Sequence, residues 1–124
     1  MHLLQRRYWW HVRRSASMSG HLWQGRYHSF PIETEAYVLE AARYIERNPL
    51  EAGLVSELLA FPWSSYGAYA AGQASPLPLH PTPVYIALGT EPAARHQCYR
   101  RFVETPQPYD KSMRRNLRAV TSYA

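Results

Sequence analysis

Prolines limit the length of every element that this chain can form after residue 30. All ten prolines of the 124-residue chain lie beyond that point, and a proline ends a helix or restricts a strand to a sheet edge because it lacks a backbone N–H. Pro49 is expected to end the helix before it, and four prolines make residues 75–83 an extended linker. The sequence therefore predicts several short elements rather than a few long ones.

Apolar spacing and capping residues locate these short elements. Residues 34–47 have the clearest helical pattern, with Thr34 as a suitable N-cap and Gly53 as a left-handed cap beyond the proline. The apolar stripe expected in this helix is Tyr37, Val38, Ala41 and Ile45. Residues 22–32, in which apolar and polar side chains alternate imperfectly, are expected to form a strand.

Further helices are predicted at both ends of the chain. They are expected over residues 3–14, 64–71 and 92–104, with a short one opened by Thr82-Pro83 and closed by Gly89. In the segment 92–104 the apolar stripe is expected to run through Ala94, Cys98 and Phe102, with Tyr99 and Val103 beside it. Gly72 is expected to end the helix over 64–71.

The basic residues are concentrated at the two ends. Thirteen of the fourteen basic residues are Arg, and residues 1–30 contain five Arg and no acidic residue. Arg forms bidentate contacts with phosphate and stacks on bases, and Arg6-Arg7-Tyr8-Trp9-Trp10 places aromatic rings beside such cations. This distribution indicates a polyanionic partner, most simply nucleic acid. A genome that encodes Arg in place of Lys, with the tryptophans filling a core, remains the alternative.

Several classes of protein are excluded by missing motifs. The chain has no glycine-rich nucleotide loop and no nucleophile elbow, and its six histidines lie far apart in the sequence. Its single cysteine, Cys98, excludes an internal disulfide and a cysteine-based zinc site. No segment has the ~20 apolar residues of a membrane span, and the N-terminus has no secretion signal. We therefore expect a cytoplasmic protein with no membrane partner.

Three stretches of the sequence resemble one known family. They are SGHLWQGRYHS (19–29), EAYVLEAARYIERNPLEAGLV (35–55) and PWSSY (62–66). These stretches are similar to the REP-associated single-tyrosine transposases, relatives of the smallest bacterial insertion-sequence transposases. TPVYIALG (82–89) and YRRF (99–102) also resemble a C-terminal part of that family.

The resemblance implies cleavage and joining of single-stranded DNA at hairpin-associated sites. A helix-borne tyrosine of the family attacks the scissile phosphate and forms a 5′-phosphotyrosine link, and its place in RYIERNP makes Tyr44 the counterpart here. A tyrosine has an ordinary pKa of about 10, so a base or metal has to activate it. The family uses a divalent metal, Mg²⁺ or Mn²⁺, held by a His-apolar-His pair. Without the resemblance, Tyr44 would be a half-buried helix aromatic.

The residues expected to contact DNA are all arginines. They are Arg6, Arg7, Arg13, Arg14, Arg26, Arg43, Arg47, Arg100 and Arg101. Arg43 and Arg47 flank Tyr44 and are expected to contact phosphate. No His-x-His occurs in the sequence, so the implied metal has no ligands in this chain and we expect cleavage to be weak or absent.

The resemblance also implies a fold and a division into parts. The expected fold class is α+β, mostly helical, as the C-terminal part of a ferredoxin-like domain with one or two strands and about five short helices. Residues 1–74 would form the catalytic portion, 75–83 a linker, 84–104 a helical extension and 105–124 a basic tail. Without sheet neighbours the strand 22–32 would expose an edge for self-association.

Three functional interpretations follow from these expectations. The chain is a transposase that nicks and joins DNA through Tyr44, an inactive remnant that still binds single-stranded or hairpin DNA, or a truncated product without a selected function. The expected location in the first two cases is the bacterial cytoplasm, at the nucleoid.

Overall fold

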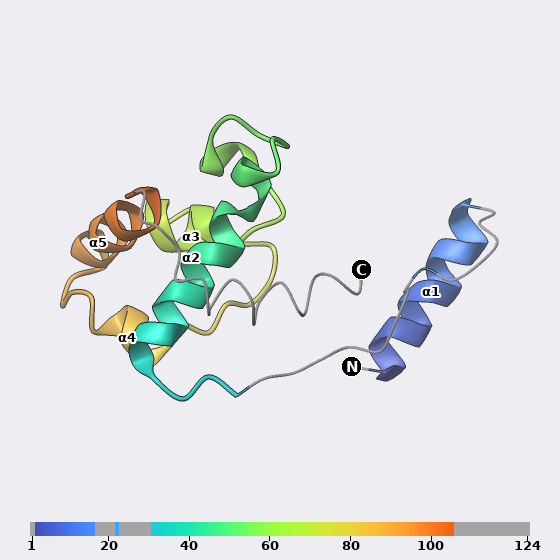
Figure 1. The fold of residues 1–124 in the computed structure, drawn as a ribbon, viewed down its shortest axis with the longest axis horizontal. Coiled ribbons are helices and arrows are strands. Elements are labelled where there is room, and N and C mark those ends of the chain that lie inside the picture. Colours follow the sequence, from blue (N-terminus) through green and yellow to red (C-terminus); the bar gives the residue numbers. More distant parts are fainter. Residues whose placement is uncertain (1, 17–21, 23–30, 106–124) are drawn as a thin grey trace. The chain divides into compact units, whose positions relative to one another are not determined.

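The computed structural model describes residues 2–16, 22 and 31–105. It divides into two compact units, one made of residues 1–31 and 108–124 and the other of residues 32–107 (Figure 1). None of the described helices combines the length and the apolar character needed to cross a membrane.

The described part of the first unit is a single basic helix. α1 spans His2–Ala16, slightly more than the predicted 3–14. It has no acidic residue in its first turn, carries Arg13 and Arg14 in its last turn, and buries none of its residues. Leu3 and Leu4 are exposed, so α1 takes no support from a core of its own.

The second unit packs five short helices around a core rich in tyrosine. They are α2 (Glu35–Glu51), the 3₁₀ helix η1 (Leu58–Ala60), α3 (Tyr66–Ala71), α4 (Pro83–Ile86) and α5 (Pro92–Glu104). α3 and α5 pack together most extensively, and α2 contacts both α4 and α5 (Figure 1). The buried core consists of Leu58, Tyr66, Ala70, Tyr85, Tyr99 and Val103. The segment 75–83 connects α3 to α4 inside this unit.

Two N-caps and two left-handed glycines are those that the sequence predicts, whereas α4 ends at Ile86 with Ala87 as its C-cap rather than at Gly89. Thr34 accepts a hydrogen bond from the Tyr37 N–H at 3.3 Å, and Thr82 does the same for the Tyr85 N–H at 3.3 Å. Gly53 and Gly72 have φ values of 69° and 64°, a left-handed conformation that glycine adopts without steric cost. Local sequence thus predicts the starts of α2 and α4 and the glycines that follow α2 and α3.

The predicted end of α2 at Pro49 is wrong. The helix continues through Pro49 to Glu51, and Ala52 N–H still donates to Asn48 O at 2.9 Å. A proline inside a helix removes one backbone hydrogen bond, but the ring of Pro49 is buried, and burial of this apolar ring offsets the loss. The stripe of α2 also differs from the prediction, because Ile45 is 63% exposed.

The predicted apolar stripe of α5 is displaced by about one residue. Tyr99 and Val103 are the buried residues of the helix, while Ala94 and Cys98 are exposed. Tyr99 is large and fits against the rings of Tyr69 and Tyr85. This contact rotates α5 relative to the orientation that the small side chains alone would favour.

The predicted α+β class is wrong for the part of the chain that the structure describes. Residues 2–16, 22 and 31–105 contain helices and turns but no strand, so they show no ferredoxin-like sheet. Of the strand predicted over 22–32, and of the self-association edge expected there, residues 23–30 lie outside the described residues, and Leu22, Pro31 and Ile32 are not in a strand. The helices bury their tyrosines against one another, so this core is built without the sheet that the resemblance implies.

Candidate functional site

Tyr44 lies half-buried on α2. The arginines near it in this helix, Arg43 and Arg47, both contact α5. Arg43 is 2% exposed, forms an ion pair with Glu40 and stacks on the Phe102 ring, whose centroid is 5.1 Å from its guanidinium carbon. Arg47 Nη1 donates to the Val103 carbonyl oxygen at 3.0 Å. Both guanidinium groups therefore hold α5 against α2.

The remaining arginines predicted to contact DNA fall into different surroundings. Arg6, Arg7, Arg13 and Arg14 are exposed on α1, and Arg101 is exposed on α5. Arg100 donates from Nε and Nη2 to the Ala70 carbonyl oxygen, at 3.2 and 2.9 Å, and so occupies the C-terminal end of α3. Arg26 lies outside the described residues.

The surface of α1 combines cations with aromatic rings. The Trp9 and Trp10 rings meet edge to face with centroids 5.2 Å apart. The guanidinium of Arg13 lies over both, 5.0 Å from the Trp9 centroid and 5.9 Å from the Trp10 centroid. Trp10 remains 49% exposed. An exposed ring beside an exposed guanidinium can stack on a base while the cation contacts phosphate.

The described residues do not fit the divalent metal that the family resemblance implies. Among residues 2–16, 22 and 31–105 there is no group of three His, Cys, Asp or Glu side chains placed to hold a metal ion. Glu40, one turn before Tyr44, is already engaged by Arg43. We therefore derive no step through a metal at Tyr44.

A second site, which the sequence did not reveal, surrounds the carboxylate of Glu46. Glu46 is 4% exposed. Its two oxygens accept hydrogen bonds from the hydroxyls of Ser64 and Ser65, at 2.7 and 2.6 Å, and Ser64 Oγ accepts from the Tyr66 N–H at 2.9 Å. The carboxylate thus joins α2 to the beginning of α3.

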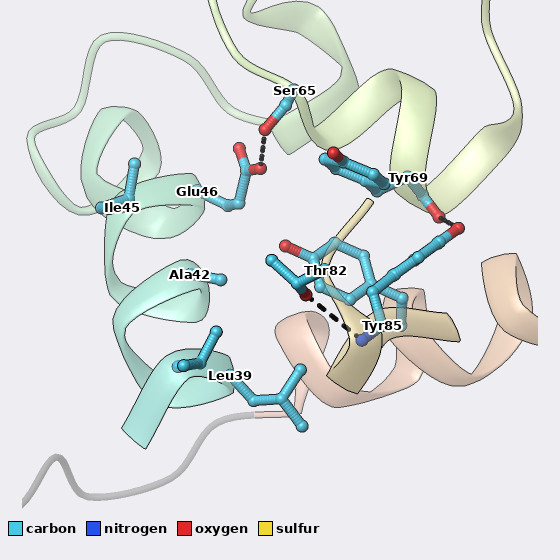
Figure 2. A pocket seen from close by; sticks show the side chains of 10 residues that line it. Leu39, Ala42, Ile45, Glu46, Ser65, Tyr69, Thr82 and Tyr85 are labelled. Carbon is cyan, nitrogen blue, oxygen red and sulfur yellow. Dashed lines mark hydrogen bonds between the residues drawn. The ribbon is translucent and has the colours of Figure 1, made fainter. Parts of the chain in front are cut away.

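Beside this carboxylate lies a cavity of about 170 Å³ (Figure 2). Side chains from α2, α3, α4 and α5 line it: Val38, Leu39, Ala42, Ile45, Glu46, Ser65, Tyr69, Thr82, Tyr85 and Tyr99. The three tyrosine rings contact one another, with centroid distances of 4.7, 5.9 and 5.4 Å. The Tyr85 hydroxyl donates to the Tyr69 carbonyl oxygen at 2.9 Å, which fixes the orientation of its ring.

The buried tyrosines are held in their neutral form. Burial raises the pKa of Tyr99 above its ordinary value, and the negative charge of Glu46 raises it further. Burial also raises the pKa of Tyr66, whose hydroxyl donates to Glu104 Oε1 at 2.9 Å and so strengthens the shift. Burial is the main cause of the raised pKa of Tyr85.

A sequence signal for the Glu46 site exists but is weak. Glu46 follows Ala42 and Val38 at intervals of four residues, so the helix places a carboxylate on an otherwise apolar face. Nothing in the local sequence shows that Ser64 and Ser65, which are typical helix-start residues, donate to that carboxylate. The pairing becomes visible only when α2 and α3 are packed together.

Comparison of the chain with protein family models, with characterised proteins and with solved structures finds no match.

Proposed function

We propose that this chain binds single-stranded or hairpin DNA and that α1 is the main contact surface. The observation that carries the proposal is the composition of the exposed surface of α1. It presents four arginines and an indole pair, and the sequence of this helix contains no acidic residue.

The physical basis is the combination of counter-ion release and stacking. Each arginine that neutralises a phosphate on a single strand releases condensed counter-ions. Affinity therefore falls as salt is added, and the log–log plot of affinity against salt has a slope of about 0.7 per contact. Four such contacts give a slope of about 2.8. A base that stacks on Trp10 adds about 1–3 kcal/mol, and this term depends little on base identity.

The salt dependence of binding tests this assignment. A labelled single-stranded oligonucleotide is titrated with the full chain over a series of salt concentrations. We expect the double substitution Arg13→Gln and Arg14→Gln to reduce the slope by about 1.4 and to lower affinity for all sequences alike. Arg101→Gln removes one exposed arginine from the second unit and serves as the comparison.

Two outcomes would contradict α1 as the main contact surface. The first is binding that does not depend on salt. The second is a loss for Arg101→Gln equal to that for the single substitution Arg13→Gln, because affinity would then follow net charge rather than one helix.

The relation to the single-tyrosine transposases is part of the same proposal, supported by the sequence similarity of residues 35–55. In the family reaction the tyrosine oxygen forms a bond to phosphorus while the bond to the 3′ oxygen breaks, and the proton lost by the tyrosine is balanced by one gained at the 3′ oxygen. We propose that Tyr44 retains this position but cleaves weakly. Arg43 and Arg47 are engaged with α5 and neighbouring carboxylates, and the sequence has no His-x-His. A nucleoid location in the cytoplasm would follow from DNA binding.

Covalent trapping tests the role of Tyr44. The full chain is incubated with a labelled hairpin and Mg²⁺ or Mn²⁺, and the products are separated under denaturing conditions. A small amount of protein–DNA adduct that disappears in Tyr44→Phe supports the proposal. An adduct that persists in Tyr44→Phe assigns the nucleophile to another residue, and no adduct with the original chain leaves DNA binding as the whole activity.

A further inference from the structure

We propose that the cavity beside Glu46 binds a small organic cation, an ammonium group on a compact apolar body, with the Glu46 carboxylate as its counter-ion. This site belongs to the second unit and is independent of DNA binding by α1. The buried charge of Glu46, the aromatic walls and the size of the space all favour such a ligand.

The charge of Glu46 is buried without a compensating cation in the described part of the chain. The side chain is 4% exposed, and its hydrogen-bond donors are the neutral hydroxyls of Ser64 and Ser65. Arg43 pairs with Glu40, and Arg47 pairs with Glu51. A buried carboxylate is costly unless it is paired, and its roughly four acceptor positions exceed the two that the serines fill.

The walls of the cavity suit a cation as well as an apolar group. Tyr69, Tyr85 and Tyr99 bring three rings to the space that Glu46 also borders (Figure 2). An aromatic ring attracts a cation placed over its face, and clusters of such rings recognise alkylammonium groups. Leu39 and Ala42 lie across from Tyr69 and Tyr85 (Figure 2), and Val38 also lines the space, so an apolar body can be buried there.

The size of the cavity limits the ligand. Its volume is about 170 Å³, close to the ~150 Å³ of an apolar cavity that admits benzene. A single ring or a short branched chain bearing one ammonium group therefore fits, whereas a nucleotide does not. The serines position the carboxylate at the edge of this space, and the ammonium group would complete its set of donors.

Binding of benzylammonium by the full chain tests the proposal. Benzyl alcohol has the same shape without the charge, and benzoate reverses the charge. Binding is measured by isothermal titration and by chemical-shift changes of the tyrosine ring protons. We expect saturable binding of benzylammonium at least tenfold tighter than that of benzyl alcohol, and no binding of benzoate.

Two substitutions locate the site. Glu46→Gln keeps a hydrogen-bond acceptor for the serines and removes the charge, so it should reduce benzylammonium affinity at least tenfold and leave benzyl alcohol unchanged. Ala42→Leu extends a side chain from α2 into the cavity and should abolish binding of both compounds, while DNA affinity stays that of the original chain. Glu91→Gln, an exposed carboxylate on another surface, is the matched control and should change nothing.

Several results would overturn the proposal. They are absence of benzylammonium binding, equal affinity for benzylammonium and benzyl alcohol, or unchanged binding in a folded Ala42→Leu variant. If Glu46→Gln fails to fold, the comparison of the three compounds and the Ala42→Leu variant still decide the matter. Circular dichroism of each variant establishes its folding before titration.

Discussion

Removing the Ser65 hydroxyl should destabilise the helical unit far more than removing an exposed serine. Ser65 Oγ donates to Glu46 Oε1 at 2.6 Å and makes no side-chain cap to α3, so Ser65→Ala removes one defined interaction. A hydrogen bond to a charged group contributes about 1.5–3 kcal/mol. We therefore expect a loss of about 2 kcal/mol in the free energy of unfolding.

The assay is thermal and urea denaturation followed by far-ultraviolet circular dichroism. In a domain of this size about 2 kcal/mol corresponds to a decrease in Tm of roughly 8–16 °C. Ser56→Ala, at an exposed position, is the matched control and should change stability by less than about 0.5 kcal/mol. In a double-mutant cycle, Ser65→Ala and Glu46→Gln should couple by about 1 kcal/mol or more. Strict additivity, or a Ser65→Ala variant as stable as Ser56→Ala, would refute the reasoning.

Two further predictions concern pH and backbone conformation. The fold raises the pKa of Tyr66 and Tyr99, so their contribution to stability is complete below the unfolded pKa of about 10 and is lost as pH rises above it. Urea denaturation should therefore show stability falling between neutral pH and about pH 11, and falling less steeply in Tyr66→Phe. A stability that does not change with pH over this range would contradict the prediction. Gly53→Ala should lower the free energy of unfolding by about 1 kcal/mol because of the positive φ alone. Gly72→Ala should lower it by more, since the added Cβ would lie 2.8 Å from His96 Cε1. Equal losses of stability in calorimetry would show that the His96 side chain moves away at no cost.

The sequence predicts the helices well because their ends depend on neighbouring residues. The boundaries of α5, Pro92–Glu104, are those predicted, and Thr34 and Thr82 cap their helices as expected. These features follow from hydrogen bonds over three or four residues, which do not depend on how the rest of the chain packs. Pro49 departs from the prediction because burial of its ring, a tertiary effect, outweighs a local preference.

The packing between helices was less predictable. Arginine is usually exposed, yet Arg43 is 2% exposed and stacks on the Phe102 ring. Glu46 is buried by serines eighteen and nineteen residues away. Phe102 and the two serines lie outside α2, so in both cases a segment distant in the sequence helps to accommodate a charged side chain. The spacing of apolar residues predicts which apolar side chains are buried, but it does not predict which groups will contact a buried charged side chain.

The α+β prediction combined the alternating pattern of residues 22–32 with the sheet that the family resemblance implies, and the described residues contain no strand. A strand over 22–32 required neighbours that would pair with it, and the described residues supply none. The Tyr44 assignment rests on the same resemblance and stays a prediction. The Glu46 cavity, in contrast, was absent from every expectation and depends only on the packing of α2, α3, α4 and α5.

The tyrosine-rich core determines which spectroscopic signals report on folding. Trp63 belongs to the helical unit and is 85% exposed, so the unit does not enclose this indole. The emission of Trp63 should therefore change little when that unit melts. The coupled rings of Tyr69, Tyr85 and Tyr99 instead give the folded state a near-ultraviolet dichroic band that disappears when their fixed geometry is lost.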